Sequence, residues 1–236
     1  MSREAWKSSY LVDVFRRAVF QRPQLFSHYV RYRSKLASNL VIPSTDIVIE
    51  GFPRSGNTFG VAAFQYAQPR KLRIARHTHA PAQVLLGIKY GVPVILLKRD
   101  PYSCISSLIV RNPDVSLEVA ITRYQWFYQS LLRYKEDVVV VDFNELINDY
   151  GSAISRVNDK YGKNFKPYHN NELTDAEVFK EVEQMERDDS GGGVRETHVS
   201  RPSNIRQGLS NTLKQEMRSG ALGEKLLECN ELYLKL

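Results

Sequence analysis

The hydrophobic pattern of the chain alternates between short apolar runs and longer segments in which apolar residues recur every three or four positions. The runs lie at 47–49, 72–77, 92–98 and 138–141, and most are rich in β-branched residues. Such runs are typical of strands buried on both faces of a parallel sheet. Because helix-like spacing separates them, the pattern predicts an α/β fold: a doubly wound, mostly parallel sheet with helices on both faces.

The segments between the runs predict helices. Two lie within residues 4–38 and are divided at Pro23, which suits the first turn of the second helix. Thr174 and Glu177 have the spacing of a capping box at the start of another helix. The other expected helices begin at Phe59 or cover 102–110, 116–134, 144–147, 152–161 and a C-terminal stretch with Leu213 and Leu227. We expect one domain over 1–236, with 1–45 as a helical extension packed on it.

The first apolar run leads directly into a glycine-containing loop, GFPRSGNT at 51–58. A strand, a loop of this kind and a helix together aim backbone N–H groups at one anion. The triphosphate-binding loop G-x-x-x-x-G-K-[ST] has a lysine where this chain has Asn57, and the positive charge lies three positions earlier, at Arg54. A glycine-rich turn that binds nothing is the alternative, and we expect a phosphate site.

Polar residues also follow the other runs. Arg99 comes directly after 92–98, and Ser107 lies eight residues further on, so a guanidinium and a hydroxyl could hold one phosphate between them. His79 follows 72–77, and an imidazole with an ordinary pKa near ~6.5 can accept a proton. Ligands of doubly wound sheets bind outside the carboxyl ends of the strands, where all these residues are expected. Ordinary surface residues are the alternative for each of them.

Four short segments together resemble the PAPS-dependent sulfotransferases of the cytosolic type, where PAPS is 3′-phosphoadenosine 5′-phosphosulfate. PRSGNTF at 53–59 resembles the family's phosphosulfate loop, and RDPYSCISS at 99–107 resembles its 3′-phosphate segment. HTHAP at 77–81 is similar to the segment with the catalytic histidine. NIRQGLSN at 204–211 resembles the late R-K-G-x-x-G segment. His77 and Gln207 stand where the family has lysines.

The resemblance implies a P-loop-like phosphosulfate-binding loop and roles for single residues. His79 would take the proton of the acceptor hydroxyl, and Arg54 would stabilise charge on the leaving nucleotide. The residues implied in donor binding are Arg54, Ser55, Gly56, Asn57, Thr58, Phe59, Arg99, Ser107, Arg206, Gln207 and Gly208. Phe59 has core packing as its alternative, and Phe143 is a further candidate for the pocket wall.

The implied reaction is in-line transfer of a sulfuryl group from PAPS to a hydroxyl or an amine. The acceptor would be a small molecule or a carbohydrate, and no metal ion is expected because PAPS has no triphosphate chain. Two other functions stay open. A small-molecule kinase with a degenerate phosphate loop would require ATP and magnesium, and a non-catalytic module would bind an anion without turnover.

The composition limits the type of ligand and the cellular compartment. The apolar fraction of 42% and the charged fraction of 25% are ordinary for globular proteins, and the net charge of +7 indicates an anionic ligand or surface. The basic residues are spread along the chain, which does not favour nucleic acid, while the basic helices within 4–38 leave peripheral membrane contact open. No run reaches the ~20 apolar residues of a membrane span. Two distant cysteines predict free thiols in a cytoplasmic protein. The oligomeric state is not predicted.

Overall fold

Four parallel strands form the central sheet of the computed structural model, which describes residues 10–32, 37–190 and 221–236 with Gly208, Leu213 and Met217. The strands are β1 (Ile47–Gly51), β2 (Ile74–Arg76), β3 (Val94–Lys98) and β4 (Val139–Asp142), in the order β2-β1-β3-β4. The register pairs Ile47 with Ile74, Val48 with Val94, and Ile95 with Val139. The α/β fold with a parallel sheet is therefore confirmed.

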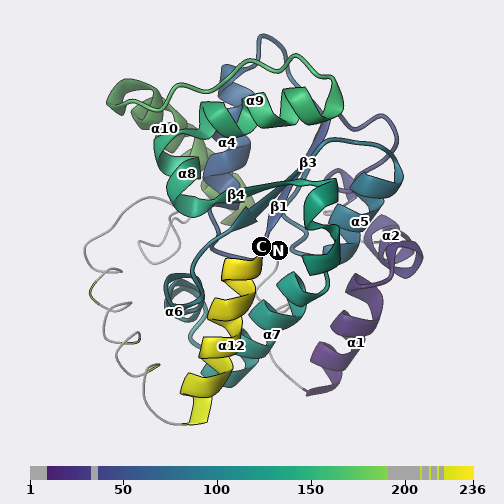
Figure 1. The fold of residues 1–236 in the computed structure, drawn as a ribbon, viewed down its shortest axis with the longest axis vertical. Helices are drawn as coiled ribbons and strands as arrows, with labels where there is room; N and C mark the ends of the chain where they lie inside the picture. Colours follow the sequence, from purple (N-terminus) through teal and green to yellow (C-terminus); the bar gives the residue numbers. More distant parts are fainter. Residues whose placement is uncertain (1–9, 33–36, 191–207, 209–212, 214–216, 218–220) are drawn as a thin grey trace.

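Helices cover both faces of the sheet. They are α1 (Tyr10–Phe20), α2 (Pro23–Tyr32), α4 (Asn57–Ala67), α5 (Pro81–Lys89), α6 (Pro101–Arg111), α7 (Leu117–Gln129), α8 (Phe143–Asn148), α9 (Tyr150–Tyr161), α10 (Glu172–Ser190) and α12 (Ala221–Lys235), with a 3-10 helix η2 at Leu132–Asp137. Alternate strand residues enter two cores because successive side chains of a strand point to opposite faces. The core that contains Ile49 includes α4, α8, α9 and α10, and the core that contains Val48 includes α5, α7 and α12 (Figure 1).

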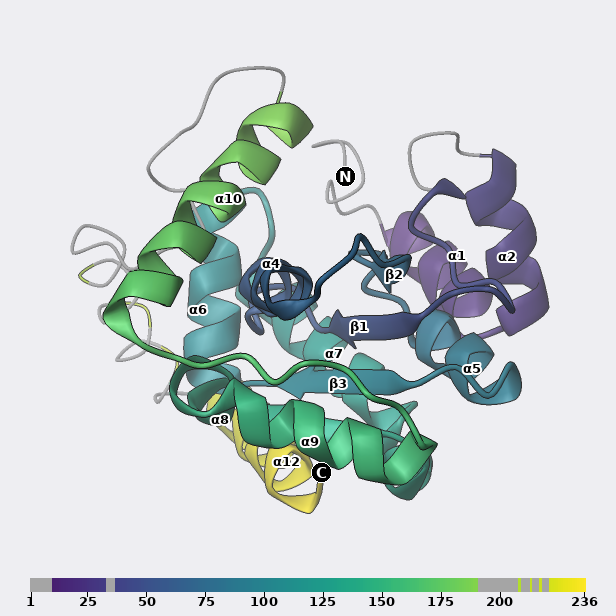
Figure 2. The ribbon, with the colours of Figure 1, turned by 90° about the horizontal axis from the view of Figure 1, so that it is seen from above.

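The carboxyl ends of β1 and β3 form the crevice in which the candidate residues lie. From β1 the chain goes to β2 on one side and later reaches β3 on the other, so this crevice is the switch point of the sheet. Figure 2 shows the arrowheads of β1 and β3 on the same side, close to α4 and α6. The loop at 52–56 follows β1, and Arg99 follows β3.

The apolar pattern does not predict α5, which carries the chain from β2 across β1 to β3. Its residues are buried on several sides, so no apolar stripe stands out. Gly87 lies against the sheet, where a methyl group would be 2.7 Å from Val94 Cγ2 and 2.9 Å from Val48 Cγ2. A parallel strand pair requires a crossover of this kind, and α5 supplies it.

The prediction of a capping box that starts at Thr174 is wrong, because Asn171 caps α10. Asn171 Oδ1 accepts hydrogen bonds from the N–H groups of Leu173 at 3.1 Å and Thr174 at 3.0 Å. Thr174 Oγ1 donates instead to the His169 carbonyl, and the helix begins earlier, at Glu172. Asparagine and threonine are both good N-caps, so the local sequence left two possible starts.

Three further expectations concern the bounds of α7, the end of α9 and the two cysteines. α7 begins at its expected cap, Ser116, but ends at Gln129, before η2. Gly162 ends α9 as expected. Cys104 and Cys229 are buried free thiols. None of the described helices combines the length and the apolar character needed to cross a membrane.

Gly56→Ala is expected to destabilise the fold more than Gly162→Ala. The two glycines have φ values of 90° and 60°, so alanine has a similar backbone penalty of about 1 kcal/mol at both. A methyl group at Gly56 would also lie 2.6 Å from Leu146 Cδ2, whereas nothing lies within 4 Å at Gly162. Overpacking of this kind costs ~1–3 kcal/mol. Urea unfolding measures the difference, and equal free energies of unfolding for the two variants would contradict the close contact between this loop and α8.

Candidate functional site

The loop after β1 is held by its own hydrogen bonds. The Ser55 N–H donates to the Phe52 carbonyl at 3.1 Å, and Asn57 Nδ2 donates to the same carbonyl at 2.9 Å. Ser55 Oγ is buried 3.0 Å from the Tyr128 hydroxyl. α4 then begins at Asn57, and its N-cap, Gly56, has no side chain to cap it. The first-turn N–H groups of α4 are therefore oriented to bind an anion.

Arg54, Arg99 and Ser107 meet beside this loop. Arg54 Nε donates to Ser107 Oγ at 3.0 Å, and Arg99 Nη1 donates to the Arg54 carbonyl at 3.0 Å. The Arg99 guanidinium carbon lies 4.0 Å from the centre of the Phe143 ring. Arg54 has a φ of 73°, a left-handed conformation that is unfavourable for a residue with a Cβ. Three residues that were selected by their positions after two strands thus lie in one hydrogen-bonded group.

Glu50 of β1 is a fully buried carboxylate beneath the next loop. It accepts hydrogen bonds from the Thr78 N–H at 2.6 Å, Thr78 Oγ1 at 2.9 Å and the His79 N–H at 3.2 Å. Burial raises the pKa of Glu50 to about 7, although these hydrogen bonds lower it. This residue was not among those selected from the sequence. Its signal was a single glutamate in the apolar strand IVIEG, where a carboxylate must have a partner.

His79 has the protonation state that a general base requires. Nδ1 lies 2.8 Å from the Gly51 carbonyl, so it carries the proton and donates, and Nε2 keeps the lone pair. Burial lowers the pKa of His79 to about 4, so the ring is neutral at neutral pH. Glu50 Oε2 lies 3.8 Å from Nδ1, beyond hydrogen-bond distance. Glu50 therefore holds the backbone of His79, and Gly51 holds its ring.

His77 does not supply the charge of the lysine that it replaces. Its side chain is half-buried with Nε2 fully buried, and desolvation lowers its pKa well below the ordinary value. Its ring centre is 6.2 Å from that of His79, and its Nε2 has no hydrogen-bond partner among the described residues. Within that part of the chain, no three His, Cys, Asp or Glu side chains are grouped to hold a metal ion.

The other residues implied in donor binding are placed in different surroundings. Phe59 packs in the core, with its ring centre 5.3 Å from that of Phe179 and 6.2 Å from that of Tyr168. This is the core-packing alternative, and a contact with adenine stays a prediction. Thr58 is half-buried in the first turn of α4, and Gly208 is exposed. Arg206 and Gln207 lie outside the described residues.

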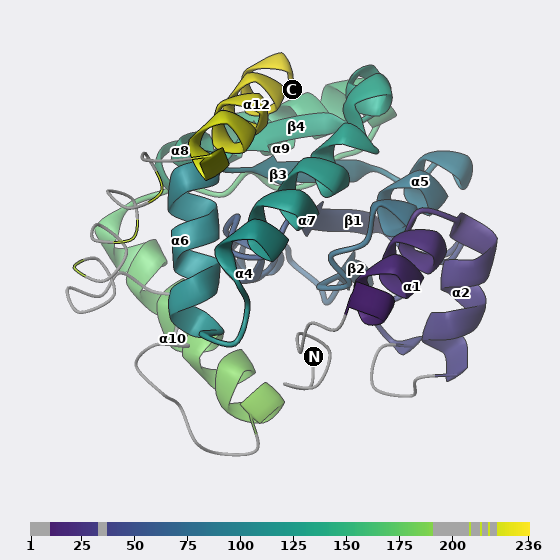
Figure 3. The ribbon, with the colours of Figure 1, turned by 90° about the horizontal axis from the view of Figure 1, so that it is seen from below.

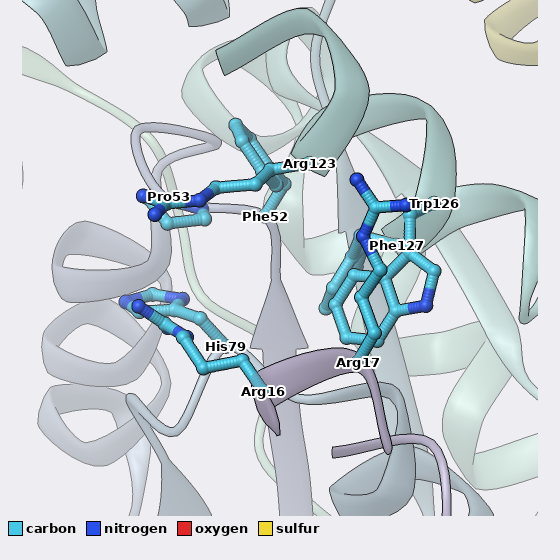
Figure 4. A pocket seen from close by; sticks show the side chains of 8 residues that line it. All are labelled: Arg16, Arg17, Phe52, Pro53, His79, Arg123, Trp126 and Phe127. Carbon is cyan, nitrogen blue, oxygen red and sulfur yellow. The ribbon is translucent and has the colours of Figure 1, made fainter. Parts of the chain in front are cut away.

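A small pocket lies beside His79, between the loop, α1 and α7 (Figure 4). Its lining consists of Arg16, Arg17, Phe52, Pro53, His79, Arg123, Trp126 and Phe127. The enclosed space is about 20 Å³, room for about one water molecule, within about 350 Å³ of empty volume that includes the open mouth. Figure 3 shows α1 on the same face of the sheet as α5 and α7. No motif marks the α1 and α7 residues of this lining individually, although Arg16, Arg17 and Arg123 lie within 1–45 and 112–125, two stretches expected to supply acceptor walls.

Glu50→Gln tests the carboxylate beneath His79. Because the pKa of Glu50 is raised, the folded protein binds more protons than the unfolded chain between about pH 4.5 and 7. The wild type should therefore lose stability relative to Glu50→Gln as the pH rises through this window. The expected change between pH 5 and 8 is on the order of 2 kcal/mol. Urea unfolding of both proteins at the two pH values measures it, and parallel profiles would contradict a buried, titrating Glu50.

No family model matches the chain, and no curated protein matches it in sequence. Among solved structures, the chain is similar to the crystal structure of mouse sulfotransferase SULT7A1 complexed with PAP, with a TM-score of 0.43 and 13% identical residues. The match covers 83% of this chain and 91% of the mouse chain.

Proposed function

We propose that the protein is a sulfotransferase that moves a sulfuryl group from PAPS to a hydroxyl, or an amine, of an acceptor. The observation that carries the proposal is the meeting of Arg54, Arg99 and Ser107 at the switch point, next to a neutral His79. The His79 ring is hydrogen-bonded to the Gly51 carbonyl of the same loop. Anion-binding groups and a base thus converge on one crevice, as group transfer from a phosphorylated donor requires.

Donor binding would use two sets of groups. Arg99 and Ser107 would hold the 3′-phosphate, since a guanidinium and a hydroxyl can donate to the same phosphate. The N–H groups of Gly56, Asn57 and Thr58, with the Thr58 hydroxyl, would hold the 5′-phosphate at the start of α4. The Ser55 N–H already donates to the Phe52 carbonyl, so its contribution would require that hydrogen bond to open.

The transfer step would place His79 and Arg54 on opposite sides of the sulfuryl group. The acceptor oxygen forms a bond to sulfur while the bond from sulfur to the bridging phosphate oxygen breaks. His79 Nε2 takes the acceptor proton, and 3′-phosphoadenosine 5′-phosphate (PAP) leaves as an anion. Arg54 would stabilise that anion by hydrogen bonding and would not protonate it, because arginine keeps its proton in proteins. Preorganised donors of this kind typically contribute a few kcal/mol.

The kinase alternative has weaker support in this loop. Its triphosphate clamp would need a cation at position 57, where the Asn57 amide donates to the Phe52 carbonyl and lies buried. The non-catalytic alternative accounts for the arginines but gives no role to a neutral, oriented His79. Measuring which nucleotide the protein binds distinguishes both alternatives from the proposal.

PAP should stabilise the wild-type protein selectively. At about a hundredfold excess over Kd, a ligand adds ~2.7 kcal/mol, or roughly 5 °C or more in Tm for a chain of this size. Arg99→Ala should lose most of the shift. Arg70→Ala is the matched control, because Arg70 is 69% exposed and pairs with Asp46, which precedes β1.

Thermal unfolding with PAP, ADP and ATP with magnesium makes the comparison. Stabilisation by ATP with magnesium alone would favour the kinase. If no nucleotide changes Tm, the sulfotransferase proposal is rejected in favour of the anion-binding module.

His79→Ala should lower sulfuryl transfer by ~10²–10⁴-fold while leaving the PAP-induced shift in Tm intact, since a general base acts on the reaction and not on nucleotide binding. Transfer of labelled sulfuryl from PAPS to a panel of phenols and sugars measures the first effect. His28→Ala, an exposed change on α2, is the control. Because the pKa of His79 is about 4, the acidic limb of kcat/KM should lie well below pH 6.5. Retained transfer in His79→Ala would rule out this base.

A further inference from the structure

The pocket beside His79 is strongly basic. Three of its eight lining residues in the described part of the chain are arginines, and none of the eight is Asp or Glu. The donor-binding residues Arg99 and Ser107 are not in this lining, so the pocket is a second set of cationic groups next to the same base. Arginine stays protonated in proteins, so these charges persist at every working pH.

One face of α7 supplies a buried guanidinium together with aromatic rings. Arg123 is only 7% exposed, and Trp126 and Phe127 follow at spacings of three and four residues, which share a helix face. The indole Nε1 of Trp126 is buried without a hydrogen-bond partner among the described residues. Phe52 closes this side, with its ring centre 6.1 Å from that of Phe127. This face can cover a ring and donate to a polar group on it.

α1 supplies the other arginines. Arg16 is half-buried and Arg17 is exposed. Figure 4 shows Arg16 beside His79 on one side of the pocket, and Arg17 with Trp126 on the other. The charge of Arg16 is one of the smaller causes, after burial, that lower the pKa of His79. An anion bound among these arginines would offset that effect and make the imidazole a better proton acceptor.

We propose that this pocket binds an acceptor whose ring carries a carboxylate or a sulfate in addition to the hydroxyl that receives the sulfuryl group. The anionic group pairs with Arg17 on the Trp126 side of the pocket, Arg123 contributes its charge from the Pro53 side, and the ring packs on Trp126. The planar guanidinium groups match either anion through paired hydrogen bonds. The inference rests on the proposed sulfotransferase function and names its substrate class.

Entry of such an acceptor requires the α1 side chains to move. The enclosed space holds about one water molecule, whereas a sugar or phenol ring needs several times more. Arg17 is exposed and long, so its side chain can swing out and then close on the anion. Residues of α1, which precede the segments that resemble sulfotransferases, thereby become part of the acceptor site.

Calorimetric titration of the protein saturated with PAP tests the pocket with matched probes. The pairs are 4-hydroxybenzoate with its methyl ester, and glucuronate with glucose. At least one anionic probe should bind about tenfold or more tightly than its neutral partner, because charge-assisted hydrogen bonds to arginine are lost in the neutral compound. Arg17→Gln and Arg123→Gln should reduce this preference, and Arg133→Gln, an exposed change in η2, should not.

The outcomes separate this inference from the proposed function. Equal binding of the two members of both pairs, no saturable binding of any probe, or a preference that survives in Arg17→Gln overturns the anionic acceptor. Arg17 is exposed, so its variant stays informative even where the buried change at Arg123 prevents folding. Binding of PAP, measured separately, decides the donor site. Anion binding through Arg17 in a protein that does not bind PAP would keep the anion site and reject its role as an acceptor site.

Discussion

The hydrogen bonds of the buried Glu50 carboxylate connect the sheet to the candidate base. The carboxylate starts on β1 and accepts from two consecutive backbone N–H groups after β2, at Thr78 and His79. A carboxylate in an apolar core is expensive unless such donors surround it, so the loop cannot move away without exposing an unpaired group. The position of the imidazole therefore depends on the packing of β1 against β2. A residue that the proposed transfer does not use thus sets the geometry of the candidate site.

The loops after β1 and β2 also contain strained backbone. Arg54, His77 and His79 have φ values of 73°, 56° and 50°, and in the described chain they are the non-glycine residues with positive φ. Each such residue costs of order 1 kcal/mol or more, and strain of this kind persists where surrounding contacts determine it. Hydrogen bonds from Arg99 to the Arg54 carbonyl and from His79 to Glu50 are such contacts. The loops after β1 and β2 are thus held in shapes that aim their side chains into one crevice.

The strands and most helices could be predicted because their signals are local. The run Val138–Val141 and the stop at Gly162 are decided by neighbours in sequence, and so is Ser116 as a cap. α5 was missed because burial on most of its sides removes the polar face by which an amphipathic helix is recognised. Arg99 and Ser107 could be selected because the ends of parallel strands meet at one edge. Glu50 could not be assigned a role, because its partners are 28 and 29 residues away.

The individual residues of the proposed acceptor pocket could not be identified from the sequence for a related reason. Within its own helix, Trp126 belongs to the apolar residues and the arginines of α1 belong to the polar ones, so neither stands out. Their chemistry appears only when α1 and α7 lie on the same side of the sheet as the loop after β1. The proposed donor side is built from strand ends, which the fold fixes, whereas the proposed acceptor side is built from helix faces. In the proposed enzyme, a different residue at the exposed position 17 would change the acceptor without disturbing the strands, the loop or His79, so substrate choice would vary independently of group transfer.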